Sequence, residues 1–200
     1  MLARALVAEA RRRDWPVLAL RRGDADIRDA AAVERWADAF APQAIFNCAA
    51  FTAVDACEER GAEADAINGE AVGNLAAAAQ RRRARLVHVS SDYVFDGAAR
   101  EPYTEAHPTA PLSAYGRSKL LGERRALTAP KALVVRTSWV FGPGGASFVA
   151  TMVRLLRARQ LPLRVVDDQV GCPTYTPFLA AALCDLAAAG AEGIVHYRNR

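Results

Sequence analysis

The chain has 200 residues, 52% of them hydrophobic, so it is long enough for one domain with a buried core, and its composition excludes a disordered segment. Its net charge of +4 is mild, and the arginine clusters at 11–13 and 81–83 lack interleaved aromatic residues, which favours solvated helix ends over a nucleic-acid surface. Four cysteines without zinc spacing, and the lack of a signal peptide or a membrane-length apolar run, favour reduced thiols in a cytoplasmic protein with no metal site.

Helical periodicity alternates with short, continuous apolar runs along the chain. The pattern predicts helices at 2–13 and 30–40, a long Ala-rich helix ending at 83, and further helices at 114–127, 148–159 and 177–189. It predicts strands at 16–20, 44–47, 85–90, 133–136, 163–166 and 193–197. This alternation is typical of an α/β fold with a doubly wound parallel sheet covered on both faces. In such folds the sites lie at the carboxyl ends of the strands.

Tyr115 and Lys119 stand four residues apart in the predicted helix 114–127, so they share a face. A lysine beside a tyrosine stabilises the phenolate and lowers the pKa of the phenol from about 10 toward the working pH. Such a tyrosine can give a proton to a carbonyl oxygen as hydride reaches its carbon. Pairs with this spacing are also common as surface neighbours, and the spacing alone leaves that interpretation open.

Two further segments follow predicted strands. Ser91 comes at the end of the strand 85–90, where its hydroxyl could bond the oxygen that Tyr115 protonates, although a serine-rich turn closed by Asp92 explains the segment equally well. Small residues at 47–55 would let a flat cofactor approach the backbone, or they form a tight loop. Together with Tyr115 these segments favour a functional interpretation.

Five segments, in order along the chain, carry a resemblance to a known family: 47–55, 87–97, 115–123, 136–141 and 167–174. They resemble the dTDP-4-dehydrorhamnose reductases, which are extended short-chain dehydrogenases with a Rossmann-like fold. The Arg-Thr-Ser-Trp and Asp-Gln-x-Gly-x-Pro-Thr blocks are similar to this reductase branch and much less to the sugar epimerases. The resemblance implies reduction of the C4 keto group of dTDP-4-dehydro-L-rhamnose to dTDP-L-rhamnose, a precursor of cell-surface polysaccharide.

The same resemblance implies roles for individual residues. Tyr115 would be the proton donor, Lys119 would hold the nicotinamide ribose, and Ser91 stands where the family commonly has threonine. Ser91, Asp92 and Trp139 would contact the sugar, with a core or rim aromatic as the alternative for Trp139. The remaining cofactor contacts that it implies are Ala50, Phe51, Thr52, Asp26 and Ile27.

The choice of cofactor depends on the residues after the predicted strand 16–20. A carboxylate there would bond the ribose hydroxyls of NADH, but the strand is followed by Arg21 and Arg22. Two guanidiniums suit the 2′-phosphate of NADPH. We therefore expect NADPH, with NADH still open, and the alternative is that both arginines face solvent.

The chain departs from the family pattern at both ends. The family begins with a strand and a Gly-rich turn, whereas this chain begins in the predicted helix 2–13, and it stops at 197–200 where the family continues into its sugar-binding lobe. We therefore expect one truncated Rossmann-like domain over 1–200, with the start of a substrate-binding lobe at about 140–200. Because the first strand lies in the middle of such a sheet, its loss leaves neighbouring strands unpaired. We expect little activity from this form.

Two other functions remain open. One is a non-catalytic NAD(P)-binding regulatory module of the same fold, although retention of Tyr115, Lys119 and Ser91 favours an enzymatic ancestry. The other is a nucleotide-sugar epimerase or dehydratase. A dehydratase would need an acidic pair beside the hydroxyl residue, whereas Ser91 is followed by Asp92 and Tyr93 with no glutamate, which disfavours it. The expected partner is a small nucleotide-sugar, with no nucleic acid or membrane, and a longer form of the chain is expected as a homodimer.

Overall fold

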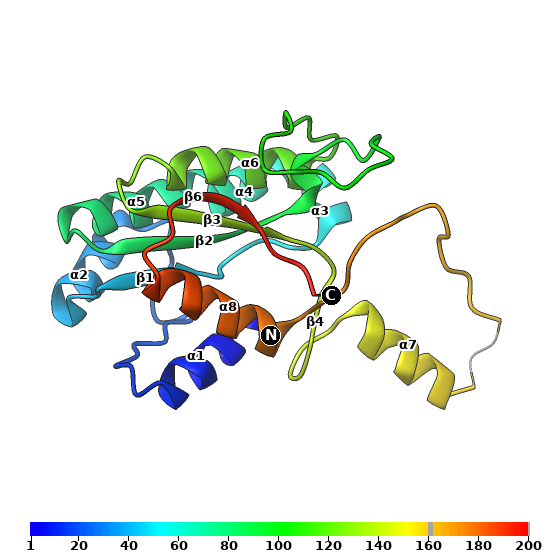
Figure 1. The fold of residues 1–200 in the computed structure, drawn as a ribbon, viewed down its shortest axis with the longest axis horizontal. Helices are drawn as coiled ribbons and strands as arrows, with labels where there is room; N and C mark the ends of the chain where they lie inside the picture. The colour runs from blue at the N-terminus through cyan, green and yellow to red at the C-terminus, as the bar shows by residue number, and fades with distance from the viewer. Residues whose placement is uncertain (160–161, 200) are drawn as a thin grey trace.

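A four-stranded parallel sheet forms the centre of the computed structural model, which describes residues 1–159 and 162–199 (Figure 1). Its strands lie in the order β1-β2-β3-β6. They are β1 (Ala44–Asn47), β2 (Arg85–Ser91), β3 (Ala132–Thr137) and β6 (Gly193–His196). Every residue of β3 is buried, as a near-continuous apolar strand covered on both faces requires. The predicted doubly wound parallel sheet is confirmed.

Helices cover the two faces of the sheet (Figure 1). One layer contains α2 (Ala30–Phe40), α5 (Ala71–Arg81) and α6 (Ala114–Ala126), and the other contains α1 (Leu2–Arg12) and α8 (Thr176–Ala188). Neighbouring residues of β2 point into different layers, because side chains alternate across a strand: Leu86 packs with the first and Val87 with the second. The helices predicted near these positions are confirmed.

The predicted Ala-rich helix ending at 83 is wrong as a single element. The segment contains α3 (Val54–Glu59), α4 (Gly61–Ala64), the π-helix η1 (Asp65–Glu70) and α5. The π-helix lies against α6, where a Cβ at Gly122 would overlap the carbonyl of Asn68. A π-turn inserts an extra residue into a helix, and here it occurs where Asn68 is turned into the core.

Two predicted strands are absent from the described structure. Residues 16–20 form no ladder, and Leu18 and Leu20 are 43% and 38% exposed. Within residues 1–159 and 162–199 no strand pairs with the outer side of β1, so this segment has no neighbour to supply ladder hydrogen bonds. Residues 163–166 belong instead to an irregular loop, with Val166 68% exposed.

The C-terminal third of the chain lies partly in the layered domain and partly in a helix that projects from it. The described structure adds a short parallel pair that was not predicted, β4 (Val140–Phe141) with β5 (Thr174–Tyr175). Whereas α8 and β6 belong to the layered domain, α7 (Phe148–Arg157) projects from it (Figure 1), and every residue of α7 is at least partly exposed. Among the described residues, no helix has both the length and the apolar character needed to cross a membrane.

Candidate active site

A cavity of about 550 Å³ lies at the carboxyl ends of β1, β2 and β3, where parallel sheets place their sites. Its walls come from the loop after β1, the end of β2, the first turns of α6 and the residues that follow β3. Seven of the residues singled out from the sequence line it: Ala50, Thr52, Ser91, Asp92, Tyr115, Lys119 and Trp139. Segments far apart in sequence therefore meet around one space.

Tyr115 and Lys119 are presented by the first turns of α6. Ser113 caps this helix, because its hydroxyl accepts a hydrogen bond of 3.0 Å from the Gly116 amide. The Lys119 side chain is buried, and its ammonium donates to the carbonyl of Val89 at 2.7 Å. Burial lowers the pKa of Lys119 to about 8, and the charge of Glu123 opposes this shift.

The predicted lowering of the Tyr115 pKa is wrong for this structure. Burial raises the pKa of Tyr115 to about 12, with the Ser91 hydroxyl opposing the shift and the carboxylate of Asp92 adding to it. The Lys119 ammonium is directed at the Val89 carbonyl, so its effect does not overcome the burial of the phenol. Tyr115 consequently keeps its proton at neutral pH, which is the state that a proton donor needs.

Ser91 and Asp92 form a compact turn at the end of β2. The Ser91 hydroxyl donates to the Asp92 carboxylate at 2.9 Å and accepts from the Tyr93 amide at 3.2 Å. It thus caps the short 3₁₀-helix η2 (Asp92–Val94) while it faces the cavity. Burial raises the pKa of Asp92. The sequence left two interpretations of these residues open, a turn and a part of the site. In the structure the same two residues form the turn and line the cavity.

Trp139 stands at the cavity with a strained backbone. Its φ of 45° is in the left-handed region, which is unusual for a bulky residue and typical of functional segments. The indole lies against Gly171, where a Cβ would come within 2.7 Å of its Cε2 atom. In the same region the Ser138 hydroxyl donates to the Cys172 carbonyl at 2.9 Å. The segments 136–141 and 167–174 therefore pack against each other.

Asn68 supports the site and was missed in the sequence. Its amide side chain accepts from the Phe51 N–H at 2.7 Å and donates to the Phe51 carbonyl at 3.0 Å and to Ser118 at 2.9 Å. Phe51 is thereby held away from the cavity against Cys57, while its neighbours Ala50 and Thr52 line it. The Asn-Gly pair at 68–69, inside a helical pattern, is the local signal that could have indicated an irregularity here.

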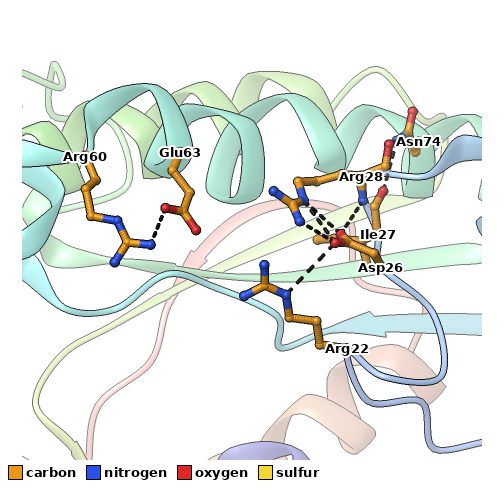
Figure 2. A network of polar contacts seen from close by, with 7 residues as sticks. All are labelled: Arg22, Asp26, Ile27, Arg28, Arg60, Glu63 and Asn74. Atoms are coloured by element: carbon orange, nitrogen blue, oxygen red, sulfur yellow. Dashed lines mark hydrogen bonds and ion pairs between the residues drawn. The ribbon is translucent and has the colours of Figure 1, made fainter.

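The other expected cofactor residues lie apart from this cavity, in a polar cluster before α2 (Figure 2). Asp26 accepts from both Nε and Nη2 of Arg28, which lowers its pKa to about 2, and Arg22 lies 4.0 Å from the same carboxylate. Asn74 donates to the Ile27 carbonyl at 2.9 Å. Arg21 is exposed, and its backbone N–H donates to Asp24. The described residues contain no group of three or more His, Cys, Asp or Glu side chains placed to hold a metal ion.

Comparison with known proteins gives one consistent family. The family model described as "RmlD substrate binding domain" matches residues 1–200. The chain is 43% identical to a dTDP-4-keto-6-deoxy-D-glucose reductase of Streptomyces niveus, covering 98% of this chain and 68% of the relative. It is 45% identical to a dTDP-4-dehydrorhamnose reductase of Streptomyces griseus, covering 96% of this chain and 64% of the relative. The chain therefore spans about two thirds of the length of these curated relatives.

Comparison with solved structures gives the same family. A dTDP-4-dehydrorhamnose reductase of Clostridium acetobutylicum superposes with a TM-score of 0.95 at 40% identity, covering 100% of this chain and 71% of that one. The Bacillus anthracis dTDP-4-dehydrorhamnose reductase in complex with NADP gives a TM-score of 0.95 at 35% identity, with the same coverage.

Proposed function

Because the chain belongs to the RmlD substrate binding domain family, we propose that it acts in the reduction of the C4 keto group of dTDP-4-dehydro-L-rhamnose by NADPH, giving dTDP-L-rhamnose. The observation that carries this proposal is the meeting of Tyr115, Lys119 and Ser91 around one cavity at the carboxyl ends of the strands. The NADP complex of the Bacillus anthracis relative supports the choice of cofactor.

The residues of the cavity fit proton transfer to a carbonyl. NADPH, when bound, supplies the hydride that forms the new C–H bond at C4. Tyr115 gives its proton to the keto oxygen, so that the carbonyl becomes a hydroxyl and the tyrosine becomes a phenolate. The Lys119 ammonium stabilises this phenolate, which then regains a proton from solvent. The Ser91 hydroxyl bonds the same oxygen once its hydrogen turns from Asp92.

The substrate and the cofactor would occupy different parts of the surface. Trp139 and Asp92 are placed to contact the sugar, because both line the cavity beside Ser91. The small side chain of Ala50, together with Thr52, leaves room for the nicotinamide end near Lys119. We place the adenosine end at Asp26 and Ile27, with Arg21 and Arg22 for the 2′-phosphate and Phe51 as a support behind the groove.

The setting of the reaction is also a proposal. The described thiols are unpaired, which supports a reducing compartment such as the cytoplasm. The projecting helix α7 supports assignment of residues from about 140 to the edge of a substrate-binding lobe. The partner is a small nucleotide-sugar, without nucleic acid or membrane, and a homodimer remains the prediction for a longer form.

An assay of a longer form of the chain with NADPH and dTDP-4-dehydro-L-rhamnose tests the proposal, because little activity is expected from residues 1–200 alone. Tyr115→Phe removes the proton donor, so we expect the rate of NADPH oxidation to fall by about a hundredfold or more. The matched control is Tyr103→Phe, whose phenol donates to Asp96 outside the cavity and whose loss should leave the rate near that of the unaltered protein. A near-normal rate for Tyr115→Phe would remove the proton-donor role, and NADPH binding without turnover by the unaltered longer form would favour the regulatory module.

A further inference from the structure

A buried ion pair lies directly behind the candidate site. Glu123 and Arg136 have side chains only 2% and 5% exposed. Arg136 donates to both carboxylate oxygens, from Nη2 at 2.7 Å and from Nε at 2.9 Å. Neither residue lines the cavity. Because taking two charges out of water is costly and apolar residues can fill a core as well, such a pair needs an explanation beyond packing.

The ion pair is joined to the strand that carries Ser91. The hydroxyl of Ser90 donates to the Glu123 carboxylate at 2.5 Å, and one turn earlier on α6 the Lys119 ammonium donates to the Val89 carbonyl at 2.7 Å. Two consecutive residues of β2 are therefore bonded to two successive turns of α6. The next residue of the strand is Ser91.

Arg136 extends the connection to the neighbouring strands. It lies opposite Ser90 in the ladder between β2 and β3, and it leads into the segment that ends at Trp139. Its guanidinium stacks over the ring of Phe95 at 5.0 Å, and its Nη1 atom lies 3.4 Å from Nε2 of His196 on β6. A change at Glu123 would therefore be transmitted to the ends of β2 and β3 together.

We propose that Glu123 is a positioning residue of the candidate site: held by Arg136, it fixes Ser90 and thereby sets where Ser91 and the Val89 carbonyl stand relative to Tyr115 and Lys119. This inference rests on the proposed reductase function and deepens it. Glu123 acts through the residues that it holds, because it contacts neither the cavity nor a reacting atom.

The charges around Lys119 support this role. Cys48 after β1 and His88 on β2 also face it, and burial keeps both uncharged by raising the pKa of the thiol to about 12 and holding the imidazole pKa well below its usual value. The amino group of Met1, which lines the same cavity, acts on Cys48, and Asp92 acts on Tyr115. Burial lowers the pKa of Lys119 to about 8. Glu123 supplies the negative charge that opposes this shift and favours the ammonium form.

The sequence allows a direct test without turnover. Lys119 and Lys131 are the chain's two lysines, so protein labelled with ¹³C-lysine gives two Cε signals by NMR. In Glu123→Gln the Lys119 titration should move to lower pH, because Arg136 is left buried without its counter-charge. The exposed Lys131, whose ammonium lies at the Arg83 carbonyl, is the internal reference and should not move.

Ser90→Ala is the matched variant. It removes the bond to β2 but leaves the ion pair in place, so it should fold even where Glu123→Gln does not. The Lys119 titration should then be retained, while kcat falls by about tenfold through misplacement of Ser91 and the KM for NADPH changes little.

Separate outcomes contradict separate proposals. A merely structural ion pair would lower the unfolding midpoint of Glu123→Gln and leave the Lys119 titration where it was, and that result, or an unchanged kcat in Ser90→Ala, overturns the positioning role. Should the unaltered longer form of the chain show no turnover while the Lys119 signal moves in Glu123→Gln, the proposed reductase function fails and the link from Glu123 to Lys119 stands.

Discussion

At the scale of the residue, burial sets the two acid–base groups in the states that the proposed reaction uses. The phenol of Tyr115 keeps its proton, since its pKa is raised to about 12, and the ammonium of Lys119 becomes easier to deprotonate, since its pKa is lowered to about 8. The tyrosine is therefore the acid over the whole neutral range. The lysine is the group whose charge changes first as the pH rises.

The pH dependence of turnover follows from this order. Below about pH 8 Lys119 is charged and can stabilise the Tyr115 phenolate, and above it the charge is lost. We expect kcat to be level around neutrality and to decline on the alkaline side of about pH 8. Single-turnover rates across pH 6 to about pH 10 would show this limb. A rate that stayed level through that range would mean that the lysine charge is not used.

At the scale of the element, the contact between η1 and α6 decides how closely the helix with Tyr115 can approach. Gly122 faces the carbonyl of Asn68, and no side chain fits between them. The same contact places Asn68 beside Phe51 and Ser118, so the close approach of the two helices holds the loop after β1. Gly122 on α6 thus allows the close contact through which Asn68 holds the loop after β1, and this loop forms one wall of the cavity.

Gly122→Ala should be destabilising for that reason. Its methyl group would overlap the Asn68 backbone, and we expect a loss of about 1–3 kcal/mol in the free energy of unfolding, measured by urea denaturation. Gly73→Ala in α5 is the control, because its methyl group would meet only the Arg125 side chain at 3.7 Å. That change should be neutral or stabilising by up to about 1 kcal/mol. Equal losses from the two variants would argue against the close contact.

The predictions made from the sequence can also be compared with the structure element by element. The helix predicted at about 30–40 is confirmed as α2, and its start is a local feature, since Asp29 accepts from the Ala32 amide at 3.0 Å. The strand predicted at 16–20 does not form, because an apolar run becomes a strand only beside a partner, and pairing is non-local. Tyr115, Lys119 and Ser91 could be predicted from motifs, whereas Asn68 and Glu123 act through contacts that no spacing in the sequence reveals.

At the scale of the whole molecule, the inner strands of the sheet differ from the outer ones. The inner strands β2 and β3 are covered on both faces and paired on both edges, while among the described residues β1 is paired with β2 alone and β6 with β3 alone. In a parallel ladder, alternate amides of an edge strand point away from its one neighbour. Half of the backbone groups of β1 therefore depend on water or side chains.

Hydrogen exchange should reveal this inequality. We expect amides of β3, including Leu133 and Val135, to be among the slowest in the chain, and the outward amides of β1 to exchange much sooner. The measurement is exchange followed residue by residue by NMR. Equal protection of β1 and β3 would require a partner on the outer side of β1.

The half-exposed ring of Trp139 has a practical consequence. It is one of three tryptophans, with Trp15 and Trp36, and of these it is the one that lines the cavity. Indole emits light in the range that reduced nicotinamide absorbs, so the site contains its own optical donor. Energy transfer from this ring could report arrival and departure of the cofactor in real time, without a label, and Trp139→Phe would isolate its signal from the other two.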